Sequence, residues 1–277
     1  MMRYVALILL FFTFLAPAGL CAEEPELINR PVNISGMTGL IITTSPYTLP
    51  PRTVEIGAAV LSENSLIPQY TSTSYPLTIS LGLGSNKELA LKTQYVYRNE
   101  DPDIMSRGID DTELSFKWNV LPQPENRNRP GLAVIVTGIF PTGDREAGTN
   151  SVNHWGCRAG LSLGSEILWE DHVIALYADG QVALQDVSDE TSRDSFTLLN
   201  AGFLVPISKY RNLQMLVEFN RRSGKDLVNI DDGDYNSFTY GLRLVNERFN
   251  LTLGTQFIHK TAEGYNNSSR VLGMLSV

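Results

Sequence analysis

Histidine and serine side chains are the first candidates for chemistry, because many hydrolases use a serine nucleophile beside a histidine base. The sequence contains three histidines, His154, His172 and His259. None has the His-X-Ser spacing that would place both groups on one face of a strand, and HExxH, CxxC and Walker-type motifs are absent. We therefore expect a protein that is not an enzyme, with no catalytic residues, no cofactor and no metal site.

A group of carboxylates in residues 226–234 is the second candidate, since clustered carboxylates can bind Ca²⁺. Asp231, Asp232 and Asp234 lie close together in this stretch. The spacing of an EF-hand is absent, so we interpret the stretch as a solvated external loop.

The composition limits the classes of protein that remain. The chain has 277 residues, of which 43% are hydrophobic and 19% are charged, as in ordinary folded proteins. A formal net charge of −8 argues against a nucleic-acid partner, because such proteins carry a basic patch.

Residues 1–22 have the features of a secretory signal: an early positive charge, a short apolar stretch and then small residues. We expect cleavage near Ala22. The alternative is lipidation of Cys21, although Leu20 occupies the preceding position, where a small residue is usual. After cleavage Cys157 is the single remaining cysteine, and no apolar run of 18 residues follows that could form a transmembrane helix.

From residue 52 onward the dominant pattern is an alternation of apolar and polar side chains, which indicates strands with two different faces. Residues 112–120 show this alternation most clearly. Each segment is close to the 9–11 residues that a tilted strand needs to cross a membrane. The pattern predicts twelve strands, at 52–62, 74–84, 88–98, 110–121, 131–141, 154–168, 173–185, 194–206, 213–223, 235–246, 249–259 and 268–277.

The connections between these segments alternate in length. Short turns are expected at 85–87, 169–172, 207–212 and 247–248, with an intermediate connection at 122–130. Longer polar loops are expected at 63–73, 99–109, 142–153, 186–193, 224–234 and 260–267. This alternation of short and long connections is typical of bacterial barrels, which have short periplasmic turns and longer external loops.

The polar face of the strands is rich in Gly, Ser, Thr and Gln as well as charge, which suits a confined wet interior better than an open surface. Aromatic residues lie mostly near strand ends, as in the girdles at the two membrane interfaces. We therefore predict an all-β fold, a transmembrane antiparallel up-and-down β-barrel of about twelve strands, with an apolar outside and a polar lumen.

In a barrel of this kind, opposite charges on the polar face would meet across the lumen. Two interpretations stay open: the charges pair and close the barrel, or they line a polar path and set its selectivity. The predicted lumen-lining residues are Glu55, Lys92, Arg98, Glu113, Lys117, Arg158, Glu166, Asp179, Glu218, Arg222, Arg243 and Arg270.

Three segments resemble a known family, the outer-membrane transporters linked to the meta-pathway of phenol degradation. They are residues 39–50 (GLIITTSPYTLP), 108–118 (GIDDTELSFKW) and 138–144 (GIFPTGD). The resemblance implies a barrel that transports small molecules, including apolar or aromatic ones. It brings no catalytic or cofactor residues with it.

The sequence thus divides into a signal peptide (1–22), an N-terminal segment (23–51) and a transmembrane β-barrel (52–277). The N-terminal segment contains Pro31, Pro46, Pro50 and Pro51, which disfavour helix and central strand. We expect this segment to lie in or under the barrel as a partial plug.

The predicted function is a channel or transporter in the bacterial outer membrane for the passive uptake of small molecules. The expected partners are outer-membrane lipid and a small-molecule solute, with no nucleic acid, and the expected state is a monomer. The first alternative is a structural or adhesive barrel with a closed lumen and partner-binding external loops. The second is an outer-membrane enzyme of lipase type.

Overall fold

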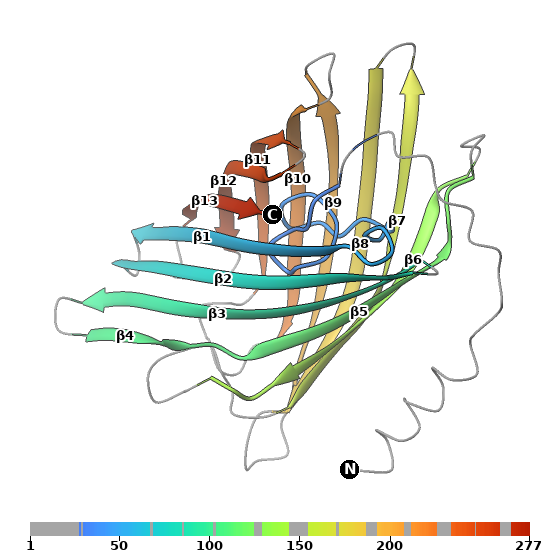
Figure 1. The fold of residues 1–277 in the computed structure, drawn as a ribbon. Coiled ribbons are helices and arrows are strands. Elements are labelled where there is room, and N and C mark those ends of the chain that lie inside the picture. Colours follow the sequence, from blue (N-terminus) through green and yellow to red (C-terminus); the bar gives the residue numbers. More distant parts are fainter. Residues whose placement is uncertain are drawn as a thin grey trace, which may run out of the picture.

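The structure is a computed structural model, shown in Figure 1. The residues that it describes are 28, 30–66, 69–84, 86–101, 104–124, 129–143, 155–169, 172–186, 193–207, 212–225, 234–246, 248–260 and 267–277. The predicted signal peptide and its cleavage site near Ala22 lie outside these residues. Among the described residues, no helix is long and apolar enough to cross a membrane.

The described chain consists of strands joined end to end. Their bounds are β1 (Val54–Leu66), β2 (Gln69–Gly84), β3 (Lys87–Asp101), β4 (Ile104–Ile109), β5 (Thr112–Leu121), β6 (Gly131–Phe140), β7 (Gly156–Trp169), β8 (His172–Asp186), β9 (Arg193–Pro206), β10 (Leu213–Lys225), β11 (Tyr235–Val245), β12 (Asn250–Lys260) and β13 (Ser268–Ser276).

Each strand pairs antiparallel with the next in sequence, except that β4 does not pair with β5, and β1 pairs with β13, which closes the sheet. Strands β4 and β5 both pair with β3, β4 near one end of it and β5 near the other. The two strands therefore form one interrupted member of a closed barrel of twelve antiparallel strands. The predicted fold class is confirmed.

The structure corrects two of the predicted loops. Most of residues 63–73 belongs to the hairpin of β1 and β2, and most of residues 99–109 belongs to β3 and β4. Strand β5 begins at Thr112, after a break at Asp110 and Asp111, rather than at residue 110. Around Ser62 and Thr73 the strands β1 and β2 continue with polar residues on both faces, so the apolar–polar alternation that marks a strand in the sequence is lost there.

The two faces of the barrel differ in the way that the alternation predicts. Large apolar side chains point outward and are exposed, as with Leu176, Phe219 and Leu253. The neighbouring inward positions carry buried polar side chains, as with Asp179, Glu218 and Thr252. An apolar outer surface around a polar interior is the arrangement of a membrane barrel and the inverse of a soluble one.

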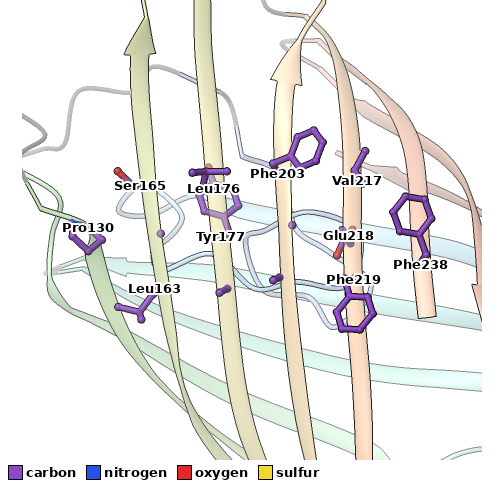
Figure 2. A pocket seen from close by; sticks show the side chains of 14 residues that line it. Pro130, Leu163, Ser165, Leu176, Tyr177, Phe203, Val217, Glu218, Phe219 and Phe238 are labelled. Carbon is purple, nitrogen blue, oxygen red and sulfur yellow. The ribbon is translucent and has the colours of Figure 1, made fainter. Parts of the chain in front are cut away.

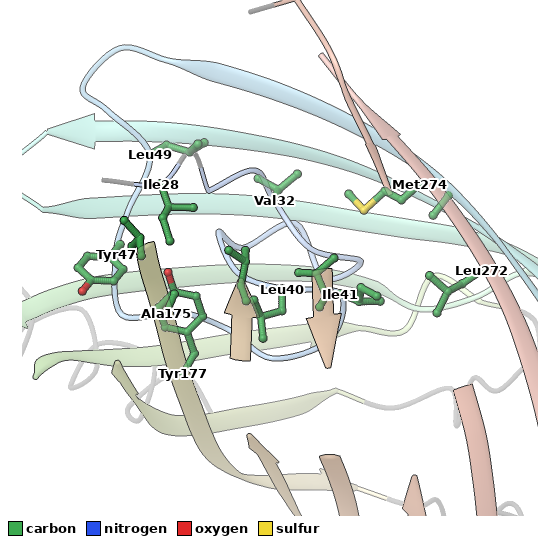
Figure 3. Close-up of a cluster of buried hydrophobic side chains, with 14 of the residues drawn as sticks. Ile28, Val32, Leu40, Ile41, Tyr47, Leu49, Ala175, Tyr177, Leu272 and Met274 are labelled. Atoms are coloured by element: carbon green, nitrogen blue, oxygen red, sulfur yellow. The ribbon is translucent and has the colours of Figure 1, made fainter. Parts of the chain in front are cut away.

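Residues 30–51, named here the inner segment, lie inside the barrel (Figure 1). Leu40, Ile41 and Tyr47 of this segment are buried, and they pack in one cluster with wall residues such as Leu216 and Leu272. Figure 3 shows side chains of the inner segment beside those of the wall. The apolar core of the molecule is therefore built between the inner segment and the barrel wall.

Candidate functional site: the lumen

The lumen of the barrel has two halves, which are named after the connections at each end. The turn side is the end with the connections at residues 85–86, 122–130, 170–171, 207–212 and 246–249, and the loop side is the opposite end. The inner segment contacts the turn-side half of the wall. Six of the twelve predicted lumen-lining residues lie there: Glu55, Lys117, Glu166, Asp179, Glu218 and Arg243. Glu88, which was not among the predicted residues, also binds the inner segment.

Glu218 on β10 makes the largest set of bonds to the inner segment. Its carboxylate accepts hydrogen bonds from the backbone N–H groups of Ile41 (2.7 Å), Ile42 (3.1 Å) and Thr43 (2.7 Å). The hydroxyl of Thr43 also donates to it, at 2.7 Å. Glu218 is almost completely buried, so a single wall carboxylate is the acceptor for three backbone N–H groups of the segment that water does not reach.

Three further wall carboxylates accept backbone hydrogen bonds in the same way. Glu88 on β3 accepts from the N–H groups of Thr38 and Leu49, both at 2.8 Å. Asp179 on β8 accepts from the N–H of Thr44 at 2.8 Å. Glu55 on β1 accepts from the N–H of Val32 at 3.2 Å.

Two buried cations of the wall donate hydrogen bonds to carbonyl groups of the segment. Arg243 on β11 donates to the carbonyl oxygens of Gly39 and Leu40. Lys117 on β5 donates to the carbonyl oxygen of Thr38 at 3.3 Å and lies 3.4 Å from Glu88. Both cations are completely buried, so these bonds replace the water that a charged group otherwise requires.

One ion pair joins a side chain of the inner segment to the wall. Arg30 lies 2.6 Å from Glu166 on β7, and its guanidinium stacks 3.8 Å from the ring centroid of Tyr47. Burial by itself lowers the pKa of Arg30, but the charge and hydrogen bond of Glu166, together with Tyr177 and Tyr47, outweigh it and raise that pKa above its usual value. Arg30 therefore stays charged at any ordinary pH, and Tyr177 donates to the same carboxylate at 3.0 Å.

The loop-side half of the lumen has its own charge cluster. Glu113 on β5 lies 2.5 Å from Arg158 on β7 and 3.3 Å from Lys92 on β3. These three side chains are partly exposed, unlike the charges around the inner segment. The cluster carries one negative and two positive groups, so its net charge is positive.

The remaining predicted residues also lie on the loop side. Arg270 on β13 pairs with Glu63 on β1 at 2.6 Å. Arg222 on β10 lies 4.1 Å from the ring centroid of Phe196 on β9, and Arg98 occupies an inward position of β3. The predicted set is thus divided between the two halves of the lumen, with six residues on the turn side and six on the loop side.

Sequence reasoning missed three residues of this arrangement. Glu88 and Glu63 stand on the polar face of their strands, but each lies near a predicted strand end and was not selected. The alternation itself could have found them, since Glu88 shares its face with Ala90 and Lys92. Arg30 could not be found in this way, because apolar and polar residues do not alternate along the inner segment.

Most of the residues first considered for chemistry lie outside the part of the chain that the structure describes. His259 is exposed and bonds Asn267, His154 lies outside the described residues, and so does most of the acidic stretch 226–234. The part of the chain that the structure describes contains no group of three His, Cys, Asp or Glu side chains arranged to hold a metal ion.

A shallow apolar groove of about 510 Å³ lies on the outer face of strands β7–β11. Figure 2 shows Leu176, Phe203, Val217, Phe219 and Phe238 around it. The groove belongs to the surface that faces outward, and the inner segment lies behind the wall at this point.

Comparison with known proteins rests on structure, since no family model and no curated protein sequence matches this chain. An outer-membrane channel from Pseudomonas putida F1 aligns over 83% of this chain and 97% of its own, with a TM-score of 0.60 and 13% identity. LpxR from Salmonella typhimurium aligns over 79% and 99%, with a TM-score of 0.54 and 9% identity. The NanC porin aligns over 81% and 98%, with a TM-score of 0.53 and 9% identity.

At these identities the likeness establishes the fold. The chain has the closed twelve-stranded architecture of outer-membrane β-barrels. The link to phenol degradation, which the sequence resemblance implied, has no support in these comparisons.

Proposed function

We propose that the protein is a passive channel of the bacterial outer membrane for small molecules, with its turn-side lumen occupied by the inner segment. The observation that carries the proposal is the polar lumen inside an apolar outer surface, with charged side chains on both the turn side and the loop side of the wall. Channel and porin barrels among the structural neighbours support the same role. Outer-membrane lipid is the proposed partner, and the proposed state is a monomer.

The solute class is also a proposal. The sequence resemblance implies small apolar or aromatic molecules, and Arg222 stacked on Phe196 offers an aromatic and a cationic surface on the loop side. Liposome swelling with an aromatic acid and with a sugar of similar size tests this proposal. Faster entry of the aromatic acid is the expected result, and equal entry would contradict it.

Deletion of residues 25–45 tests the channel function and the proposed role of the segment as a plug. The deletion removes the part of the segment that Glu88, Glu218 and Asp179 bind. We expect larger single-channel steps in planar bilayers than the full chain gives. A band that shifts on heating in SDS gels is required of both proteins, as the control for a folded barrel.

Three results would contradict the plug or the channel function. Equal conductance of the folded deletion variant and the full chain would exclude a plug. Absence of conductance in both folded proteins would favour the alternative, a structural or adhesive barrel whose lumen is closed by charge pairs. Lipase activity of the purified full chain would favour the enzyme alternative.

Replacement of Glu113 by Gln tests whether the loop-side charges set ion selectivity. The change removes the negative charge between Lys92 and Arg158 and leaves both cations facing the lumen. We expect the anion-to-cation permeability ratio to rise roughly twofold to fivefold, because one charge acting through water contributes about 1 kcal/mol or less. The reversal potential in a salt gradient measures this ratio, and an unchanged potential would exclude Glu113 from the ion path.

A further inference from the structure

The inner segment is an irregular chain buried in a protein interior, and its backbone polar groups need partners there. Its two isolated bridges, Val32 with Thr38 and Gly39 with Thr44, are formed within the segment itself. No strand of the wall is paired with the described part of the segment. Its contact with the wall is made through wall side chains instead.

The wall supplies acceptors for a run of consecutive N–H groups. Glu218 binds the N–H groups of Ile41, Ile42 and Thr43, and Asp179 binds that of the next residue, Thr44. Hydrogen bonds to a carboxylate are shorter and stronger than those between neutral groups. Four successive backbone amides are thus held by two carboxylates on β10 and β8.

The wall also supplies donors for the carbonyl groups on either side of this run. Arg243 donates to the carbonyl groups of Gly39 and Leu40, and Ser162 donates to that of Thr44 at 2.6 Å. These bonds involve the main chain, which every peptide shares. Recognition at this place therefore depends less on side-chain identity than on the presence of free backbone N–H groups.

We propose that the turn-side half of the lumen is a binding site for peptide main chain, occupied here by residues 38–44 and open to other peptides when that stretch is displaced. The proposal rests on the proposed channel function, which gives peptides a route to the site. The acidic and basic wall groups that bind the segment comprise five carboxylates and two cations, a formal net charge of −3. A ligand rich in N–H groups and positive charge fits such a wall, and a polyanion does not. The wall groups are Glu55, Glu88, Glu166, Asp179, Glu218, Lys117 and Arg243.

Proline substitutions in the full chain test this site, because proline has no backbone N–H to donate. The variant Ile42→Pro/Thr44→Pro loses one N–H bound by Glu218 and the N–H bound by Asp179, and its wall is unchanged. We expect the segment to leave its place in this variant. A fluorescent peptide with the natural sequence of residues 30–51 should then bind the detergent-solubilised protein, as measured by fluorescence anisotropy, and should reduce its conductance in planar bilayers.

Two altered peptides separate main-chain from side-chain recognition. The peptide with proline at 42 and 44 should bind at least about tenfold more weakly than the natural one, because bonds to charged groups are lost. The peptide with alanine at the same two positions keeps both N–H groups and should bind within about threefold of the natural peptide. If the Ile42→Pro/Thr44→Pro protein does not fold, the single variant Thr44→Pro takes its place.

The outcomes distinguish this site from the channel function on which it rests. Equal binding of the natural and proline peptides, or binding of neither, would overturn the main-chain site even if the protein conducts ions. Selective binding of the natural and alanine peptides supports the site. Selective binding without conductance in any variant would support the site and overturn the channel.

Discussion

Replacement of Glu218 by Ala is expected to release the inner segment from the wall. Three backbone N–H groups, those of Ile41, Ile42 and Thr43, lose their acceptor inside the lumen. A buried donor without a partner costs about 1–3 kcal/mol, so the seated position should lose about 3 kcal/mol or more. The ratio of released to seated segment should therefore rise roughly a hundredfold.

Two measurements detect the release of the segment. Channel openings in planar bilayers should become more frequent, and chymotrypsin should cut the segment after Tyr47 faster than in the unchanged protein. The matched control is Glu63→Ala, which removes a carboxylate of the same wall that binds Arg270 and Ser268 on the loop side. If both variants changed channel opening and cleavage equally, the bonds of Glu218 would not be what keeps the segment in place.

The strands were predictable because a strand with two different environments leaves a period of two in the sequence. Strand β6, predicted at 131–141, runs from Gly131 to Phe140, and β12 was placed within one residue at each end. The prediction fails where both environments are aqueous. The residues of β1 and β2 around Ser62 and Thr73 are polar on both faces, so no alternation marks them.

The contacts of the inner segment were not predictable in the same way. Prolines disfavoured a helix or a central strand, but they do not indicate which wall residues the segment meets. Glu218 lies 177 residues from Ile41 in the sequence, and the two meet because of the tilt and stagger of the barrel. The sequence therefore indicates which side chains face the lumen, and the closure of the barrel decides which of them meet the segment.

The buried ion pair of Lys117 and Glu88 is the second place where a large effect is expected. Both side chains are completely buried, 3.4 Å apart, and both bind Thr38 of the inner segment. Removal of one partner leaves the other charge buried and uncompensated, at a cost of about 3–5 kcal/mol. The variant Lys117→Met should therefore lower the free energy of unfolding in phospholipid vesicles by about this amount, as measured by reversible urea unfolding.

A double-mutant cycle separates the pair from the loss of either residue alone. The N–H groups of Thr38 and Leu49 bind different oxygens of Glu88, so in Glu88→Gln the single amide oxygen keeps one of these bonds, and the variant loses the charge and the other bond. Together with Lys117→Met it should cost less than the two single changes added, by about 1–3 kcal/mol. The control is Lys92→Met, whose partner Glu113 is partly exposed and keeps Arg158, so its cost should stay below about 1 kcal/mol. Strict additivity of the Lys117 and Glu88 changes would mean that the two charges do not stabilise each other, and that the bonds to the inner segment account for both effects.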